Sequence, residues 1–358
     1  MTRWGWRPKP IERAAPVIAA SPDRLESFCS RVLDTEGRPC SDDPRCLARL
    51  FRDFFGLEGT PRLSRALDLM SSLGVSLEEV QYLETGAVNM YKDGWHVHFA
   101  FKDPPGTQKF DLLHEAYEIV DKTFAALIPS YQGIKEPLLS RNADRFAAAV
   151  LMPRDFICRK MAESGCDPVL LGEELELSHQ ALLIAFAECL PDTPFGAALW
   201  DRNPDAADSS LVPEDFQAAL VVRSTPARYA RRLCLSQRVQ AKGSGVATGS
   251  LACLAVKSGL AVLCHPEDSE GAAAVLVRPI PWRGHGLGRV LLLALPAEEY
   301  HLLQPQVESL NPAPLLVPSW ATPACRFEDG FRDCSHCRRD EDRMEKMNAD
   351  MEDDFNDI

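Results

Sequence analysis

The chain has 358 residues, of which 46% are hydrophobic and 25% charged, and its formal net charge at pH 7 is −13. Its length allows two or three domains, and its composition is that of an ordinary globular protein. The acidic balance argues against a broadly basic surface for direct nucleic-acid binding. No apolar run approaches the roughly 18 residues that a membrane span needs.

The first ten residues carry charge and lack the apolar run of a secretory signal peptide. We therefore expect a cytoplasmic protein that does not associate with membranes. The 12 cysteines are dispersed along the chain, which suits reduced thiols in that compartment.

Residues 1–42 contain Pro, Arg and Ala without clear periodicity and are expected to form an N-terminal extension. Asp43-Pro44 then begins a short helix. Cys40 and Cys46 are close enough in sequence to suggest a metal clip. No further ligand nearby completes such a clip, so two unpaired thiols are the favoured interpretation.

A second helix begins at Thr60-Pro61 and ends at Gly74. Three β-type runs follow it, at residues 75–83, 87–91 and 95–101. A tight-turn signal, Lys-Asp-Gly, separates the last two runs. These runs predict a small antiparallel sheet.

The last of these runs alternates apolar residues with His96 and His98, which gives the strand one apolar face and one more polar face. The two histidines could approach the helix that follows, where the sequence suggests a metal site. They could also lie on a solvated face, and this second interpretation is favoured.

Thr107 can cap that following helix, whose buried face is predicted by apolar residues at helical spacing. His114 and Glu118 project about 40° apart on the flank of this face, the geometry in which a helix offers two ligands to one metal ion. Glu115 lies beside them, where a carboxylate can take a proton from a metal-bound water. This H-E-x-x-E sequence differs from the zincin motif H-E-x-x-H only at its last position.

A further helix ends in Phe146-Ala-Ala-Ala-Val-Leu-Met-Pro153. Together with Phe110-Asp-Leu-Leu-His114-Glu115, it resembles the paired motifs of the ImmA/IrrE metallopeptidases, F-x-L-x-H-E-x-x-H and E-A-N-x-F-A-x-x-L-L-M-P. The resemblance covers roughly residues 60 to 200. It implies a minimal zincin fold in which an edge strand beside the site holds an extended peptide. It also implies a protein substrate such as a helix-turn-helix repressor.

The same resemblance implies that a zinc ion is held by positions 114, 118 and 142, with Glu115 as the catalytic base. Two of these positions depart from the family, which has His at 118 and Glu at 142, whereas this chain has Glu118 and Asn142. A carboxylate can bind zinc, but the neutral carbonyl of Asn142 is a poor ligand. Asp144 does not obviously replace it, because the two residues point about 200° apart on the helix.

Two functions therefore remain open at the sequence level. The first is a regulatory metallopeptidase with an H-E-x-x-E site, and the second is a catalytically inactive pseudo-peptidase that regulates by binding a peptide or sensing a signal. The segment after Pro153 contains a helix-turn-helix-like pair near Leu175–Leu182, but its second helix has no Arg or Lys before Cys189. A packing unit is favoured over a DNA reader.

Residues 191–213 are rich in Pro, Asp and Ser and are predicted to be a linker. Short β-type runs and two helical stretches follow, which predict a second α/β domain similar to the GAF-like sensor domain of some ImmA/IrrE proteins. In the C-terminal tail, Cys325, Cys334 and Cys337 could hold a second metal. Residues 340–358 are strongly acidic and are expected to be disordered.

The sequence as a whole predicts an α+β protein in which a zincin-like domain, of a small antiparallel sheet plus helices, is followed by a helical bundle and a second α/β domain. The predicted divisions are the extension 1–42, the zincin-like domain 43–157, the helical segment and linker 158–203, the sensor-like domain 204–318 and the tail 319–358.

Overall fold

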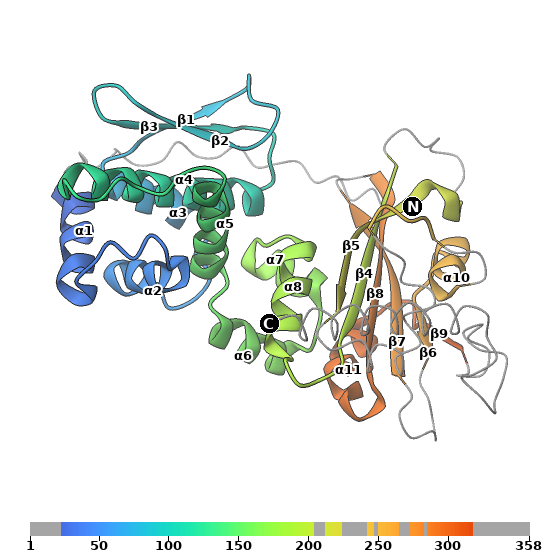
Figure 1. Cartoon of the computed structure of the whole chain (residues 1–358). Coiled ribbons are helices and arrows are strands. Elements are labelled where there is room, and N and C mark those ends of the chain that lie inside the picture. The colour runs from blue at the N-terminus through green and yellow to red at the C-terminus, as the bar shows by residue number, and fades with distance from the viewer. Residues whose placement is uncertain are drawn as a thin grey trace, which may run out of the picture. The chain divides into compact units, whose positions relative to one another are not determined.

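The computed structural model describes residues 23–203, 212–223, 242–246, 250–264, 273–282 and 285–317 of the chain shown in Figure 1. It divides into two compact units, with the boundary between Cys189 and Leu190. Helices and mixed sheets make up both units, so the predicted multi-domain α+β class is confirmed. No helix in the described ranges is long and apolar enough to span a bilayer.

The N-terminal unit is built mainly from helices. Their bounds are α1 (Asp23–Glu36), α2 (Pro44–Phe55), α3 (Leu63–Ser72), α4 (Pro105–Leu127), α5 (Leu138–Leu151), α6 (Arg154–Ser164), α7 (Pro168–Leu175) and α8 (His179–Cys189). Phe28, Phe51, Phe146 and Tyr117 are fully buried where α1, α2, α4 and α5 meet. The rings of Phe51 and Phe146 meet edge to face at 5.4 Å, an arrangement that aromatic pairs prefer.

A three-stranded sheet lies along α4 (Figure 1), formed by β1 (Ser76–Val80), β2 (Ala87–Tyr91) and β3 (Trp95–Ala100). β3 is the middle strand, antiparallel to β2 but parallel to β1. The sheet is therefore mixed and not purely antiparallel as predicted. The buried residues Val97 and Phe99 make β3 the most apolar strand, which accounts for its central place, and the chain must then cross over between β1 and β2.

His96 and His98 alternate with these two buried residues. His96 Nε2 lies 2.7 Å from Asp93 Oδ1, and His98 Nε2 lies 3.3 Å from Glu78 Oε2. Both histidines therefore belong to the face opposite Val97 and Phe99, as favoured from the sequence.

Two buried cations connect distant parts of this unit. Lys109 on α4 is fully buried, and its Nζ donates to the carbonyls of Pro61 at 3.0 Å and Leu175 at 2.6 Å. Burial lowers the pKa of Lys109 to about 8. Arg52 on α2 donates to three backbone carbonyls, one of which, that of Val150, lies on α5. These bonds satisfy carbonyls that side chains of other types would leave unpaired.

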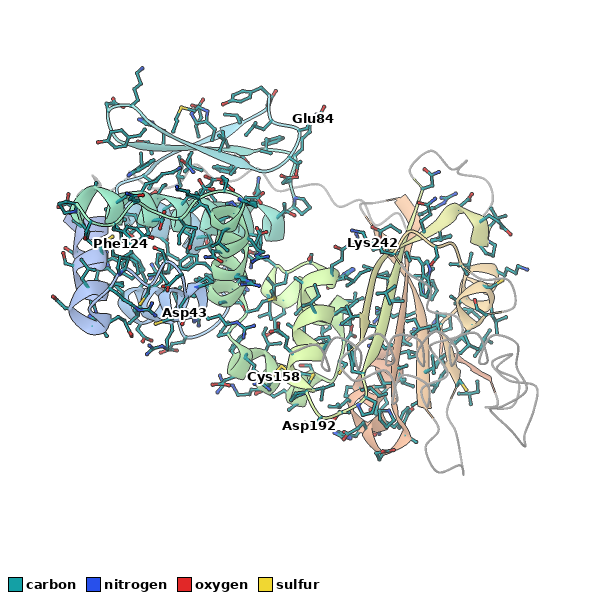
Figure 2. The ribbon with its side chains drawn as sticks, in the orientation of Figure 1. Asp43, Glu84, Phe124, Cys158, Asp192 and Lys242 are labelled. Atoms are coloured by element: carbon teal, nitrogen blue, oxygen red, sulfur yellow. A yellow bond between two sulfur atoms is a disulfide. The ribbon has the colours of Figure 1, made fainter. Side chains whose placement is uncertain are left out.

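The helix-turn-helix-like pair predicted near Leu175–Leu182 is the α7–α8 unit, whose Leu171, Leu182 and Phe186 are fully buried. Cys158 on α6 is bonded to Cys189 at the end of α8 (Figure 2). The expectation that all cysteines are reduced thiols is therefore wrong for this pair.

The C-terminal unit contains one sheet, in which the described strands are ordered β5-β4-β8-β7-β6-β9. Its elements are β4 (Gly196–Arg202), η1 (Pro213–Asp215), β5 (Phe216–Arg223), α10 (Leu251–Ser258), β6 (Val262–Cys264), β7 (Ala273–Trp282), β8 (His285–Pro296), η2 (Ala297–Leu302), α11 (Gln304–Ser309) and β9 (Leu315–Val317). Only the pair of β6 and β9 is parallel among these described strands.

Strand β4 corrects the predicted linker at 191–213. It pairs with β5 on one side and β8 on the other, and its residues Ala198 and Leu199 are fully buried. Asp201 on β4 and Arg289 on β8 form a two-pronged ion pair at 2.7 and 3.1 Å. The five predicted domain divisions stay predictions. Residues 23–42 of the predicted N-terminal extension are described, and they contain α1, whose Phe28, Cys29 and Val32 are fully buried. The cysteine-containing tail, 319–358, lies outside the described residues.

Candidate functional site

Helix α4 positions the three residues of the predicted motif. Glu115 is buried on this helix, while His114 and Glu118 are partly exposed on its flank. Asn89 reaches them from β2 and Asp144 reaches them from α5. The predicted motif therefore lies where the sheet, α4 and α5 come together.

His114 is held by two carboxylates, one at each ring nitrogen. Nδ1 lies 2.9 Å from Asp144 Oδ1, and Nε2 lies 3.5 Å from Glu118 Oε1. The hydrogen bond to Glu118, together with that to Asp144, raises the pKa of His114 to about 9 against the opposing effect of burial. The raised pKa favours the imidazolium form, in which both ring nitrogens are donors.

Glu118 is the centre of a wider polar network. Its Oε2 accepts from Asn89 Nδ2 at 2.9 Å and lies 3.1 Å from Lys122 Nζ. Lys122 also donates to Asn89 Oδ1 at 2.8 Å. The hydrogen bond from His114, helped by those from Asn89 and Lys122, lowers the pKa of Glu118 to about 2. Glu118 is thus a carboxylate whose charge is stabilised by His114, Asn89 and Lys122 against the opposing effect of burial.

Glu115, the predicted catalytic base, accepts a hydrogen bond from the side-chain amide of Asn89. Burial raises the pKa of Glu115 despite this bond. A raised pKa is a property of catalytic carboxylates and also of carboxylates that are simply buried. The value therefore does not by itself distinguish the two functions that the sequence leaves open.

Asn142 does not join this group. Its side chain is buried, and Nδ2 donates to the backbone carbonyl of Ser41 at 3.2 Å. The same carbonyl accepts a hydrogen bond from the hydroxyl of Tyr117. Since Asn142 and Asp144 project about 200° apart, the helix face that presents Asp144 to His114 turns Asn142 toward the connection between α1 and α2. The convergence of positions 114, 118 and 142 on one ion stays a prediction, which the bond from Asn142 to Ser41 disfavours.

The described residues offer an incomplete ligand set for a zinc ion at this place. A metal-binding imidazole must present a lone pair, and each nitrogen of His114 faces a carboxylate, Nδ1 that of Asp144 and Nε2 that of Glu118. The amide of the third expected ligand, Asn142, donates to Ser41. Within the described ranges, His114 belongs to no group of three His, Cys, Asp or Glu residues whose ligand atoms could share an ion. We therefore derive no chemical step through a metal at this place.

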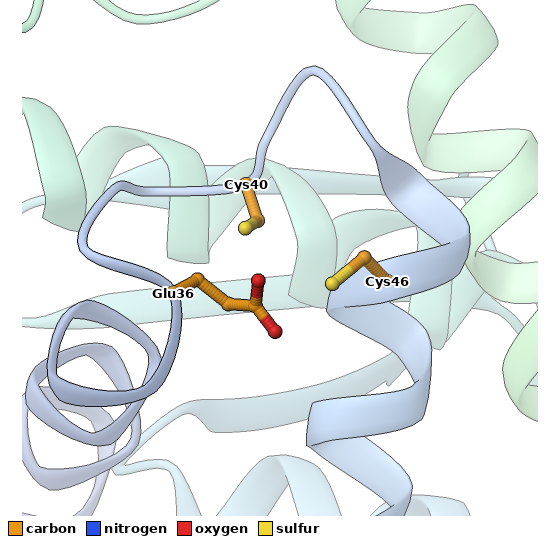
Figure 3. Close-up of side chains that lie close together, drawn as sticks. All are labelled: Glu36, Cys40 and Cys46. Atoms are coloured by element: carbon orange, nitrogen blue, oxygen red, sulfur yellow. The ribbon is translucent and has the colours of Figure 1, made fainter.

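A different group of metal-binding residue types does come together in the N-terminal unit. The ligand atoms of Glu36, Cys40 and Cys46 all lie within 4.8 Å of one another (Figure 3). The sequence pattern indicated the two cysteines but not Glu36. The signal available was the four-residue spacing from Glu36 to Cys40 at the end of a helix, which is too common to be noticed alone.

The architecture establishes the class of molecule only as a multi-domain α+β protein. No family model matches the chain, and no curated protein matches it in sequence. Among solved structures, a Mycobacterium tuberculosis transcriptional regulator matches with a TM-score of 0.47 at 13% identity. That match covers 83% of this chain and 88% of the other. A likeness this distant carries no conclusion about function.

Proposed function

We propose that this chain is a non-catalytic relative of the ImmA/IrrE metallopeptidases, which regulates by binding a peptide beside an ion-pair network that stands where the family has its metal. One observation carries this proposal. Both nitrogens of His114 are engaged by carboxylates, those of Glu118 and Asp144. The motif residues remain on α4, but they form ion pairs that stabilise the fold.

The sheet supports the binding half of the proposal. β2 is an edge strand of the described sheet. Two hydrogen bonds, from Ala100 N to Gly86 O and from Lys92 N to Gly94 O, determine which residues of β2 direct their backbone amides toward β3. In the register of β2 and β3, the backbone amides of Val88 and Met90 face β3. The amides of Ala87, Asn89 and Tyr91 face the open edge of the sheet. An extended peptide can add to such an edge by backbone hydrogen bonds.

The side chains along β2 suit this role. Val88 and Met90 are 40% and 41% exposed, and alternate exposed apolar residues provide contacts for a bound strand. Asn89, between them, points into the ion-pair network and connects the edge to Glu115 and Glu118. A peptide on β2 would therefore lie beside the old catalytic motif.

The alternative function is an active metallopeptidase, and it is supported by the distance between His114 and Glu118. His114 Nε2 and Glu118 Oε1 lie 3.5 Å apart on adjacent turns, close enough for one ion to replace their shared proton. The deciding experiment compares zinc bound by the wild-type chain with zinc bound by His114→Ala, so that metal held elsewhere cancels. We expect no difference. One equivalent lost in His114→Ala, together with proteolysis lost in Glu115→Gln, would establish the enzyme.

The binding half is tested with Ala87→Pro, whose missing amide faces the open edge of β2, and with Val88→Pro, which removes a bond to β3. We expect peptides selected against the wild-type chain from an extended-peptide library to lose binding to Ala87→Pro while the protein stays folded. Val88→Pro should unfold the sheet and serves as the reference for structural damage. Unchanged binding to Ala87→Pro would contradict recognition at this edge.

A further inference from the structure

A short connection between two helices brings two thiols and a carboxylate together. Glu36 is the last residue of α1, Cys40 lies in the connection, and Cys46 lies in the first turn of α2. Figure 3 shows their side chains gathered in the space between the end of α1 and the start of α2. Cys40 is buried at 1% exposure, whereas Glu36 and Cys46 are partly exposed. The group is thus open to solvent on one side.

We propose that Glu36, Cys40 and Cys46 form a Zn²⁺ site that fastens α1 to α2, with a water molecule as the fourth ligand. Two thiolates and a carboxylate are ligands of the types that zinc prefers. Zinc holds sulfur at about 2.3 Å and oxygen at about 2.0–2.2 Å, so ligand atoms around one tetrahedral ion lie roughly 3.6–3.8 Å apart. The ligand atoms of the three residues all lie within 4.8 Å of one another, so binding an ion requires them to close by at most roughly 1 Å.

The surrounding charge suits this ion. Arg49, one turn after Cys46 on α2, places Nη2 at 3.6 Å from Cys46 Sγ and 3.3 Å from Glu36 Oε1. Three anionic ligands and one divalent cation leave a net charge of −1 (−3 + 2), and the Arg49 guanidinium balances it. The N-terminus of α2 adds a partial positive charge beside Cys46.

Residues of α4 and α5 hold the connection that carries Cys40 in place. Cys40 has a positive φ of 56°, which an ordinary side chain adopts only when its surroundings require it. The carbonyl of the next residue, Ser41, accepts hydrogen bonds from Asn142 and Tyr117. Asn142 on α5, which the sequence suggested as a zinc ligand, therefore stabilises the connection that carries Cys40. Such support fixes the positions of metal ligands before the ion binds.

Metal binding must be measured without interference from the tail cysteines. The full-length chain with Cys325→Ser, Cys334→Ser and Cys337→Ser is reduced, stripped with a chelator and titrated with Zn²⁺, then with Co²⁺ as a spectroscopic probe. We expect one equivalent of metal per chain and a thiolate-to-cobalt absorption band. Zinc should also raise the unfolding temperature, because it binds only the folded arrangement.

Three further substitutions in that background locate the site. Cys46→Ser, at a partly exposed position, should weaken metal binding on the order of a hundredfold and so abolish the thiolate band at one equivalent of cobalt. Glu36→Gln should weaken binding by about tenfold while keeping the band, since both thiolates remain. Glu26→Gln, on an exposed position of α1, is the matched control and should change nothing. Circular dichroism confirms that each variant is folded.

Several results would overturn the proposal. They are a chain that gives no cobalt–thiolate band, a band that survives Cys46→Ser, or equal effects of Glu36→Gln and Glu26→Gln. A Cys40–Cys46 disulfide in a chain that never binds metal would identify a redox pair in its place. None of these results depends on His114, so the zinc site and the proposed function fail independently.

Discussion

Removing the His114 ring should destabilise the N-terminal unit by an amount that depends on pH. The pKa of His114 is about 9 in the folded chain against 6.5 without its partners. The difference, 9 − 6.5 = 2.5, corresponds to about 3 kcal/mol at roughly 1.36 kcal/mol for each tenfold change in proton affinity. The ring is 18% exposed and its partner Asp144 is 57% exposed, so solvent screening makes about 3 kcal/mol an upper value.

The sign follows from the direction of the pKa shift. A raised pKa in the folded state means that the stabilisation is fully present below pH 6.5 and is lost as pH rises through about 9. The pKa of Glu118 is lowered to about 2, so its share of the same ion pair is lost only in strong acid. Between these two pKa values the shifts of His114 and Glu118 describe the same ion pair, so its stabilisation energy is included once.

The assay is urea unfolding of the full chain, followed by pulse proteolysis that scores the fragment containing α4. His114→Gln should be less stable than wild type by about 2–3 kcal/mol at pH 6 and nearly equal to it at pH 10. His96→Gln, which removes a more exposed histidine–carboxylate pair, is the matched control and should cost less than about 1 kcal/mol. A loss in His114→Gln that is the same at both pH values would refute the ion-pair reasoning.

Three other substitutions test contacts between elements of the N-terminal unit. Lys109→Met should cost about 2–5 kcal/mol in urea unfolding, because it leaves two buried carbonyls unpaired, and a cost below 1 kcal/mol would contradict this. Gly106→Ala would place a Cβ 2.7 Å from the backbone oxygen of Glu176; the unfolding temperature should fall, since overpacking of about 1–3 kcal/mol exceeds the helix-propensity gain. Arg52→Lys keeps the charge but cannot reach all three carbonyls, so it should lose about 2 kcal/mol in the same assay.

The local parts of the fold were readable from the sequence. Helical spacing of apolar residues predicted α4, the motif ending in Met152-Pro153 predicted a helix where α5 lies, and the i, i+4 rule placed His114 beside Glu118, as the structure shows. The sequence did not show whether Asn142 or Asp144 would lie beside His114. This depends on how α5 is rotated against α4, which is set by burial of Asn142 on Ser41, a residue 101 positions away.

The errors in the sheets have a similar cause. β1 pairs parallel to β3, and neither strand carries a local signal for the direction of its partner. β4 was hidden in a segment that its Pro, Asp and Ser neighbours made look like a linker. Its role became visible only when β5 and β8 were seen on either side. Glu36 joins Cys40 and Cys46 through a turn whose path the sequence does not specify.

The protonation state of the His114 ring tests the central claim most directly. Nitrogen-15 NMR of the histidine rings, with His114 assigned by its loss in His114→Gln, reports each ring nitrogen separately. The ion-pair account predicts that both nitrogens carry protons at pH 7 and that the ring titrates with a pKa near 9. A neutral ring at pH 7 whose Nε2 signal shifts on adding zinc would contradict it.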